Sequence, residues 1–145
     1  MSLLWGFSFK NARIAEADET VIGMALSYPI AETSPDNPDD FPAPVAPFVE
    51  LEAKSAGTWY INALAVFAGR QGAGIGSQLL SDAETQALSA GYRMMSIQVY
   101  AQNTGAFSLY ERSGYKITAR AKVRLHPCQP YYTGDVLLLF KSLQS

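Results

Sequence analysis

The stretch RQGAGIGSQLL, residues 70–80, sets three glycines at alternate positions directly before a segment whose apolar residues have helical spacing. The glycines are Gly72, Gly74 and Gly76. The preceding segment TWYINALAVF, residues 58–67, is mostly apolar and holds several β-branched and aromatic residues, so it predicts a central strand. From Ile75 to Leu88 the apolar positions recur as along one face of a helix, and Gly91 is expected to end that helix. The stretch therefore predicts a strand that turns through bare backbone into a helix.

The segments on either side predict a hairpin, further strands and one more helix. The expected elements are strands at 13–17, 21–28, 94–101, 115–125 and 135–143, and a helix from Asn103 to Arg112 that Gly114 stops. A strand, a helix and a strand in succession form a right-handed parallel unit in nearly every known protein. The mostly short connections elsewhere favour antiparallel pairing. The predicted fold class is therefore α/β, with a mixed, mostly antiparallel sheet around a central parallel strand–helix–strand unit.

The composition fits one domain that spans residues 1–145. Apolar residues make up 48% and charged residues 17%, and the net charge is -2. No basic stripe is present, which argues against a nucleic acid as the main partner. The apolar start lacks the pattern of a signal peptide, and the run VLLLF is too short to span a membrane. With Cys128 as its single cysteine the chain cannot form an intrachain disulfide, so a cytoplasmic protein without a membrane partner is expected.

Residues 29–56 are expected to form a long inserted loop, rich in proline and acidic side chains. Six of the eight prolines fall within residues 29–48, and prolines at this density stiffen a chain. Loops of this length in a compact domain commonly serve a function. Two interpretations of the acids are open, because they could attract a cationic acceptor or simply keep the loop solvated. The acids in or beside the loop are Glu32, Asp36, Asp39, Asp40, Glu50 and Glu52.

The alternate glycines favour a phosphate-bearing ligand over a plain tight turn. A helix N-terminus presents free N–H groups and a partial positive charge, and phosphate binds there without a lysine. A P-loop would need Lys directly after the last glycine, but Ser77 follows Gly76. A dinucleotide fingerprint would need glycine at position 77 and an acidic residue about 20 positions on, where SIQVY stands instead. Both common phosphate motifs are therefore excluded.

A third pattern fits these residues. Gln71-x-x-Gly74-x-Gly76 resembles the acyl-coenzyme A loop of the GNAT superfamily of N-acetyltransferases, in which Gln or Arg is followed by x-x-Gly-x-Gly/Ala. LAV at 64–66 is similar to the end of the strand before that loop. NTGAFSLYERSGY at 103–115 is similar to the family's second signature, in which Asn opens a helix and Tyr sits just before its end.

The chain departs from the family's pattern in three places. Ala68 stands where the family often has Pro, and Ala73 where it often has Arg or Lys. The family also has a first strand and two helices before its hairpin, and the resemblance here begins only at about Ala12. Those N-terminal elements, which close part of the acceptor site, are therefore expected to be missing.

The resemblance implies direct transfer of an acetyl group from acetyl-coenzyme A to an amine of a small molecule or a peptide, without a metal. It implies that the backbone N–H near Val66 binds the thioester oxygen and that Tyr110 protonates the departing thiolate. From the residues alone, Tyr110 could instead be a core aromatic beside Phe107, and Asn103 a plain helix cap. The residues implied to bind the cofactor are Leu64, Ala65, Val66, Gln71, Gly72, Ala73, Gly74, Ile75, Gly76, Asn103 and Tyr110.

The sequence does not single out the base that would deprotonate the amine. In the family the base often projects from the positions of Tyr60 and Asn62, and neither side chain is a good base near neutral pH. His126, in the loop between the last two strands, and a water relay are the other candidates. Cys128 is not expected to be a nucleophile, because Pro127 separates it from His126 and no orienting motif accompanies the pair.

Two other functional classes compete with the enzyme. The chain could be a coenzyme A-binding module without turnover, since elements of the acceptor site are expected to be missing. A redox dinucleotide domain is the third class, and the failed fingerprint argues against it. An incomplete sheet would expose a strand edge, so a homodimer is a possible assembly.

Overall fold

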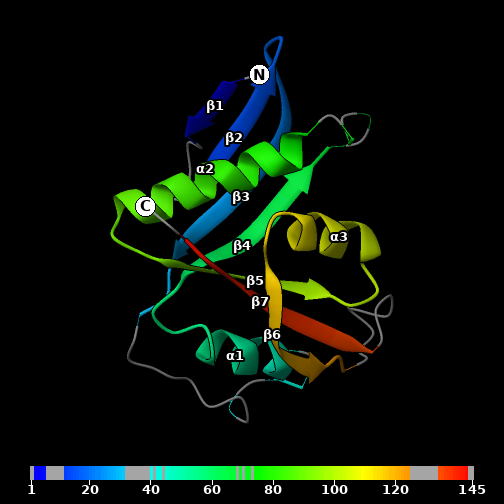
Figure 1. The fold of residues 1–145 in the computed structure, drawn as a ribbon. Helices are drawn as coiled ribbons and strands as arrows, with labels where there is room; N and C mark the ends of the chain where they lie inside the picture. The colour runs from blue at the N-terminus through cyan, green and yellow to red at the C-terminus, as the bar shows by residue number, and fades with distance from the viewer. Residues whose placement is uncertain are drawn as a thin grey trace.

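The computed structural model describes residues 2–5, 12–31, 40, 42–43, 45–67, 69, 71–72, 74–124 and 134–143. These residues form one seven-stranded sheet, in the order β1-β2-β3-β4-β5-β7-β6, together with three helices (Figure 1). The strands are β1 Ser2–Trp5, β2 Ala12–Ala17, β3 Thr20–Pro29, β4 Trp59–Val66, β5 Met94–Tyr100, β6 Lys116–Lys122 and β7 Asp135–Ser142. The helices are α1 Ala46–Ala53, α2 Ile75–Ser89 and α3 Thr104–Arg112.

The sheet is mixed, with one parallel pair. β4 and β5 run parallel and are connected through α2. The other neighbouring pairs of described strands are antiparallel. The predicted fold class is therefore confirmed, including the strand–helix–strand unit that residues 58–101 predicted.

Alternating side chains along β7 separate the two faces of the sheet. Leu137 and Leu139 pack with residues of α2 and α3, whereas Val136 and Leu138 pack with Leu51 of α1. The ribbon agrees, since α2 and α3 lie on one side of the strands and α1 lies beside β6 and β7 (Figure 1). We call these two surfaces the α2/α3 face and the α1 face.

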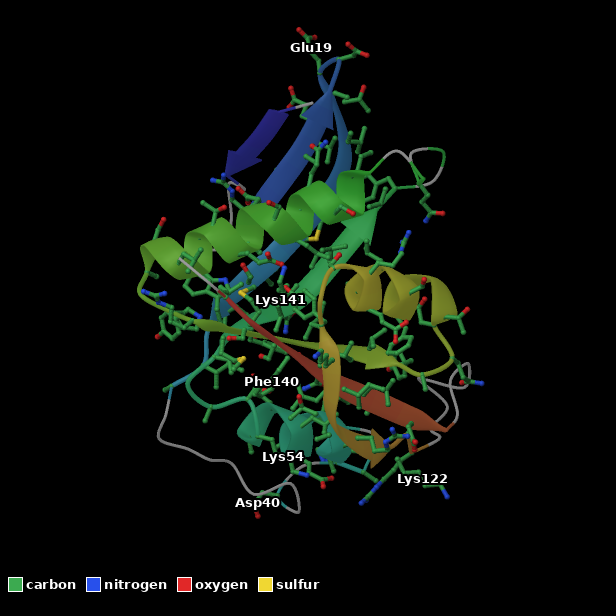
Figure 2. The ribbon with its side chains drawn as sticks, viewed as in Figure 1. Glu19, Asp40, Lys54, Lys122, Phe140 and Lys141 are labelled. Carbon is green, nitrogen blue, oxygen red and sulfur yellow. The ribbon has the colours of Figure 1, made fainter. Side chains whose placement is uncertain are left out.

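Polar anchors fix α2 against the sheet. The Arg13 guanidinium donates two hydrogen bonds of 2.9 Å to the Asp82 carboxylate. From β7, Lys141 (labelled in Figure 2) reaches Glu84 at 2.9 Å, and the Tyr115 hydroxyl donates to the same carboxylate at 3.0 Å. Charge-assisted bonds between partly buried groups are stronger than neutral ones. The helix is therefore held from β2 on one side and from β7 on the other, which fixes where its N-terminus lies.

The start of the chain differs from the expectation. The predicted hairpin is present as β2 and β3, but a further strand, β1, pairs antiparallel with β2 from Ser2 to Trp5. The sequence did not predict this strand, and the expectation that the family's first strand and two helices are missing stays a prediction. A strand of four residues, three of them apolar, is too short to show the period of a strand, and only the neighbouring edge of β2 reveals the pairing. Among the residues that the structure describes, no helix precedes β2.

Within residues 29–56, expected to be a loop, the structure places the helix α1. Pro47 lies in the first turn of this helix. The first N–H groups of a helix have no partner within it, so the missing N–H of proline costs no hydrogen bond there. Leu51 is fully buried against β6 and β7, with Phe48 packed at the edge of the same cluster. The prolines suggested irregular chain, yet this one marks a helix start, and burial of the apolar side chains stabilises the helix.

Candidate functional site

β4 and β5 separate partway along their length. They pair only over Trp59–Ile61 and Met95–Ile97, and residues 62–66 of β4 have no described partner in β5. At the same point the register between β3 and β4 shifts, because Asn62 is an extra residue on β4. A bulge of this kind bends its strand. Figure 1 shows β4 and β5 diverging toward their arrowheads, with α3 beside the opening, and we call this opening the fork.

The bent half of β4 turns backbone groups toward the fork. The N–H of Phe67 donates to the Ile22 carbonyl of β3 at 2.9 Å. Successive residues of a strand point their N–H and C=O groups to opposite sides. The polar backbone groups of Val66 and Leu64 therefore point away from β3, and the Val66 carbonyl is reached by the Gln71 amide at 3.4 Å. β4 thus offers N–H groups that its neighbours in the sheet do not use.

The glycine-rich turn adds further free N–H groups at the start of α2. Gly72 and Gly74 have φ angles of +86° and +78°, and a Cβ on either would meet no atom within 4 Å. Gly74 is the N-cap residue and supplies no side-chain cap. The first intrahelical bond runs from Gln78 N–H to the Gly74 carbonyl at 3.1 Å. The preceding N–H groups of the helix are therefore left for an anionic ligand, in space that the glycines keep open.

The second signature forms α3 on the opposite side of the fork. Asn103 is its N-cap, and its Oδ1 accepts a hydrogen bond of 3.3 Å from the N–H of Ala106. This is the predicted capping role. Close packing joins the two signatures, because a Cβ on Gly76 would lie 2.8 Å from the Leu109 side chain. The predicted glycine turn and the predicted helix therefore form one site.

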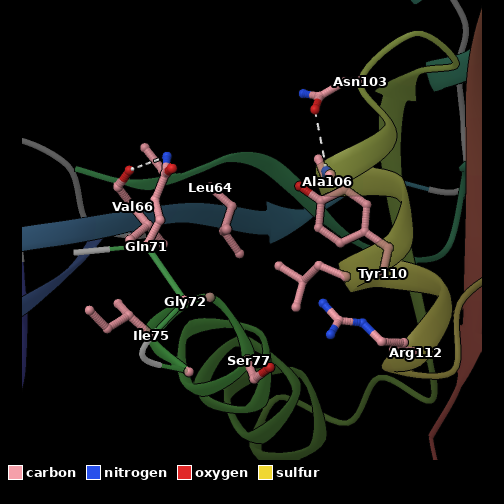
Figure 3. Close-up of a pocket in the computed structure, with 15 residues that line it drawn as sticks. Leu64, Val66, Gln71, Gly72, Ile75, Ser77, Asn103, Ala106, Tyr110 and Arg112 are labelled. Carbon is pink, nitrogen blue, oxygen red and sulfur yellow. Dashed lines mark hydrogen bonds between the residues drawn. The ribbon is translucent and has the colours of Figure 1, made fainter. Parts of the chain in front are cut away.

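A cavity of about 720 Å³ lies between the end of β4, the start of α2 and α3 (Figure 3). This volume is in the range of small-molecule and cofactor pockets. Every residue that the sequence implied for cofactor binding lines it, except Ala73, which lies outside the described residues. Those lining residues are Leu64, Ala65, Val66, Gln71, Gly72, Gly74, Ile75, Gly76, Asn103 and Tyr110.

Tyr110 forms part of the cavity wall although it is buried. Its side chain points from α3 toward β4 (Figure 3) and is 6% exposed. Burial raises the pKa of its phenol above the ordinary value of 10.0. At neutral pH the hydroxyl therefore keeps its proton and can donate it. The ring also contacts Tyr115 at 6.3 Å between centroids, so the core-aromatic interpretation is compatible with the position.

Sequence reasoning missed several residues of the cavity. They are Ser77, Gly105, Ala106, Leu109 and Arg112. Arg112 is the most informative, since its exposed side chain points from α3 toward the side of Ser77 (Figure 3) and brings a positive charge to the cavity. Its Nε donates to the Ser108 carbonyl at 3.2 Å. In sequence it resembled an ordinary basic residue at a helix C-terminus.

The candidate bases lie elsewhere. Tyr60 is buried between Trp59 and Ile61, which face α2 and α3, so it points to the α1 face. Asn62 is exposed and donates a hydrogen bond of 3.1 Å to the Tyr28 hydroxyl. Burial, followed by the charge of Glu52 and the neighbouring Tyr28, raises the pKa of Tyr60 well above its ordinary value. Neither residue lines the cavity.

Some predicted residues lie outside the described part of the chain. They are Glu32, Asp36, Asp39, Ala68, His126 and Cys128. Asp40 is described and exposed. In the described ranges, no cluster of three or more His, Cys, Asp and Glu side chains could hold a metal ion. No helix of those ranges has both the length and the apolar character needed to cross a membrane.

Comparisons with known proteins agree with this arrangement. The sequence model of the Acetyltransferase (GNAT) family matches residues 5–115. The structure is similar to a GNAT family acetyltransferase from Elizabethkingia anophelis with acetyl-CoA bound, at a TM-score of 0.64 and 22% identity, over 91% of this chain and 75% of that one. It is also similar to IAA acetyltransferase from Bacillus cereus ATCC 14579, at a TM-score of 0.66 and 20% identity, over 91% and 77% of the two chains.

A third similar structure is a ribosomal-protein-alanine N-acetyltransferase from Brucella melitensis, with a TM-score of 0.65 and 17% identity, over 91% of this chain and 68% of that one. At these identities the likeness shows a shared fold. Among curated proteins, none matches this sequence. Because the family match covers well over half of the residues and includes both signatures, this chain belongs to the acetyltransferase (GNAT) family.

Proposed function

We propose that this protein transfers the acetyl group of acetyl-coenzyme A to a primary amine of a small molecule or a peptide. One observation carries the proposal: the cavity joins free N–H groups of β4 and of the α2 N-terminus to the hydroxyl of Tyr110. Free N–H groups suit phosphates and a developing oxyanion, and a buried phenol suits a departing thiolate. The acetyl-CoA bound in the similar GNAT family acetyltransferase from Elizabethkingia anophelis supports the same use here.

In this proposal the residues divide the work along the cavity. The N–H groups from Gly74 to Ser77 bind the pyrophosphate, and Arg112 adds a positive charge near it. The thioester, held near Val66, is the acyl donor. The N–H of Val66 stabilises the negative charge that develops on its carbonyl oxygen. Asn103 holds the start of α3 in place through its cap.

The proposed reaction is a direct transfer within a ternary complex. The amine nitrogen attacks the thioester carbonyl carbon, so a C–N bond forms and the C–S bond breaks. Sulfur leaves as a thiolate and takes the proton of the Tyr110 hydroxyl. The amine gives its proton to water, and the phenolate of Tyr110 regains one from solvent. Because a phenol has a pKa of about 10 and a thiol one of about 8.5, this proton transfer is slightly uphill, and the return of a proton from solvent to the Tyr110 phenolate completes it.

The test is thiol release from acetyl-coenzyme A in the presence of primary amines, each paired with its neutral alcohol of the same length. We expect thiol release to depend on both the amine and its concentration. A calorimetric titration with acetyl-coenzyme A accompanies the assay. Binding without amine-dependent release across α-amines, lysine side chains and small alkylamines would identify a coenzyme A-binding module without turnover. Failure to bind acetyl-coenzyme A would reject the proposal outright.

A further inference from the structure

The charges of the chain are unevenly distributed along its sequence. The net charge is -2, yet residues 112–124 hold five basic side chains and no acidic one. All of these basic side chains are exposed, and all but the first lie on β6 or directly after it. They are Arg112, Lys116, Arg120, Lys122 and Arg124. The surface along β6 is therefore positively charged although the molecule as a whole is not.

A bulge separates Lys116 from the other basic residues of β6. The register between β6 and β7 shifts once along β6, and a shift by one residue moves the side chains that follow to the other face. Lys116 is the partner of Phe140, which packs on the α1 face. Arg120 is instead the partner of Leu137, which packs with α2 and α3. Since side chains alternate along a strand, Lys122 lies on the α2/α3 face together with Arg120.

Arg120 and Lys122 also turn their backbone groups away from β7. The N–H of Val123 donates to the Gly134 carbonyl at 2.8 Å, so the backbone groups of Val123 point toward β7. Backbone groups alternate between the two sides of an antiparallel strand, and those of Lys122 and Arg120 therefore point to the outer edge of β6. In the described part of the chain β6 is the last strand of the sheet. Its outer edge can therefore accept a further strand.

The positive charges of this edge are little used within the molecule. Arg120 lies 3.6 Å from the Asp135 carboxylate of β7, but both side chains are exposed, and an exposed ion pair of this kind is weak. The ion pairs among the described residues include neither Lys122 nor Arg124. Figure 2 shows Lys122 at the end of β6 that lies away from α2. The charges of Lys122 and Arg124 are therefore left for an external partner.

We propose that the outer edge of β6 binds an extended acidic segment of a partner protein, which adds to the sheet as an antiparallel strand. The backbone groups of Arg120 and Lys122 hold the main chain of that segment. Acidic side chains opposite these two residues form cross-strand pairs of opposite charge. The intervening side chains lie on the α1 face beside Ala121 and Val123, which are buried. The segment that fits therefore alternates acidic residues with apolar ones.

The charges argue against a second copy of this chain as the occupant. If two β6 edges paired about a twofold axis, every register that joins residues 120–124 of the two copies would set a cation opposite a cation, which is destabilising. The strand at the other end of the sheet, β1, has the sequence SLLW and carries no acidic side chain. Basic side chains on an edge strand thus oppose pairing between copies, and the same charges attract an acidic strand.

The β6 edge is separate from the cofactor cavity. Arg120, Lys122 and Arg124 do not line the cavity. In the order of the sheet, β7 and β5 stand between β6 and β4. A partner bound at β6 therefore leaves the cavity open, and the inference does not depend on the proposed function.

The experiment is an NMR titration of the ¹⁵N-labelled full chain with the peptide Ac-Glu-Val-Glu-Val-Glu-NH2. One control peptide has lysine in place of each glutamate. The other has methylated glutamate nitrogens, so it keeps the charge but loses the N–H groups that would pair with β6. We expect the acidic peptide to shift the amide signals of Arg120 and Lys122 in a saturable manner and to slow their hydrogen exchange. Both controls should bind about tenfold more weakly or not at all.

Lys122→Glu and Lys116→Glu form a matched pair of variants. Both replace an exposed lysine of β6 by the same acid, but the two side chains lie on opposite faces of the strand. Lys122→Glu should weaken binding of the acidic peptide by about tenfold, because an attraction becomes a repulsion, and Lys116→Glu should bind nearly like the wild type. Lys122→Gln, which adds no acid beside Asp135, should show a smaller loss in the same direction. Unchanged amide signals of α2 and α3 verify the fold of each variant.

Several results would overturn the inference. They are β6 amides that do not respond to the acidic peptide, a methylated peptide that binds as tightly, and equal losses in Lys122→Glu and Lys116→Glu. An oligothymidylate that shifts the same amides with the same affinity would show a general site for polyanions. Self-association of the chain that the acidic peptide reverses, measured by sedimentation, would assign the edge to a second copy instead.

Discussion

β5 has two neighbours in the sheet and pairs with them very differently. With β7 it pairs along its whole length, from Met94 to Tyr100, but with β4 it pairs at only three residues. On the β7 side the backbone groups are used within the sheet, and the side chains form a continuous core. On the β4 side the strands diverge, and backbone N–H groups are left for a ligand. At the fork, backbone N–H groups of β4 therefore form no hydrogen bonds within the sheet, and these N–H groups can bind a cofactor instead.

A phenol at the fork, Tyr110, can be compared with a phenol on the β7 side, Tyr115. The largest effect on turnover is expected from this pair. Tyr110→Phe should lower kcat by about 10²–10⁴-fold, because it removes a positioned acid. Acetyl-coenzyme A affinity and the melting temperature should change little, since the ring still packs. Tyr115→Phe, on the closed side, should do the reverse: its hydroxyl donates to Glu84 at 3.0 Å, and losing that bond lowers the free energy of unfolding by about 1–3 kcal/mol.

The pH profile sharpens the same comparison. Burial raises the pKa of Tyr110, so its proton is held beyond the pH of about 10 at which an ordinary phenol ionises. The rate should therefore not fall through loss of this proton until the pH exceeds 10. If kcat falls well below pH 10 in the wild type and this fall is absent in Tyr110→Phe, then Tyr110 loses its proton early and its pKa is not raised. Unchanged turnover in the variant would leave Tyr110 as a core aromatic.

Gly74 and Gly91 stand at the two ends of α2, and only Gly74 borders the fork. Both have positive φ angles, and a Cβ on either would enter open space. Glutamate at either site should therefore destabilise the fold equally, by about 1–2 kcal/mol. Gly74→Glu should in addition weaken acetyl-coenzyme A binding by about 100-fold or more in calorimetry, because its carboxylate would face the phosphates. Equal affinities in the two variants would move the phosphate site away from α2.

Arg112 and Arg93 are both exposed cations, but Arg112 lines the cavity and Arg93 does not. Arg112→Gln should weaken acetyl-coenzyme A binding by about threefold to tenfold, since an exposed charge is partly screened by solvent. The affinity of the variant should also depend less on salt than that of the wild type. Arg93→Gln should leave both quantities unchanged. A loss of the same size in both variants would indicate a general effect of net charge.

The smallest effect is expected in the β2–β3 turn, where a substitution should change stability but not catalysis or cofactor binding. Asp18 and Glu19 have φ angles of 51° and 63°, in a turn that usually takes Asn-Gly. Glu19, at the tip in Figure 2, is far from the fork. Glu19→Gly should raise the free energy of unfolding by about 0.5–1 kcal/mol, measured by urea denaturation. If it also changed kcat or acetyl-coenzyme A affinity, the site would extend farther along the sheet than the fork.

The parts of the site that the sequence could predict are those that local spacing determines. Gly72, Gly74 and Gly76 lie on a single turn between a strand and a helix, so their spacing already implies bare backbone at a helix N-terminus. Asn103 lies directly before the helix that it caps, and Tyr110 lies two turns farther along the same helix. Each of these positions depends on its neighbours in the chain, and the structure brings them to one cavity as expected.

The rest depended on contacts between distant segments. The helix α1 could not be predicted from its proline-rich, acidic segment, because it depends on the packing of Leu51 against β6 and β7. The pairing of β1 depends on the edge of β2, and the four residues of β1 alone could not reveal it. Arg112 lines the cavity because α3 packs opposite the start of α2, which the sequence does not show. Such features follow from where a segment packs, and one sequence holds no local signal for that.

The account is tested most directly by amide hydrogen exchange with and without acetyl-coenzyme A. Its central claim is that the cofactor takes up backbone groups that the sheet leaves free at the fork. Acetyl-coenzyme A should slow exchange at Leu64 and Val66 of β4 and at residues 74–77 at the start of α2. Exchange in the β2–β3 hairpin should not change. Binding that leaves the residues of the fork unprotected, or that protects the hairpin instead, would contradict the account.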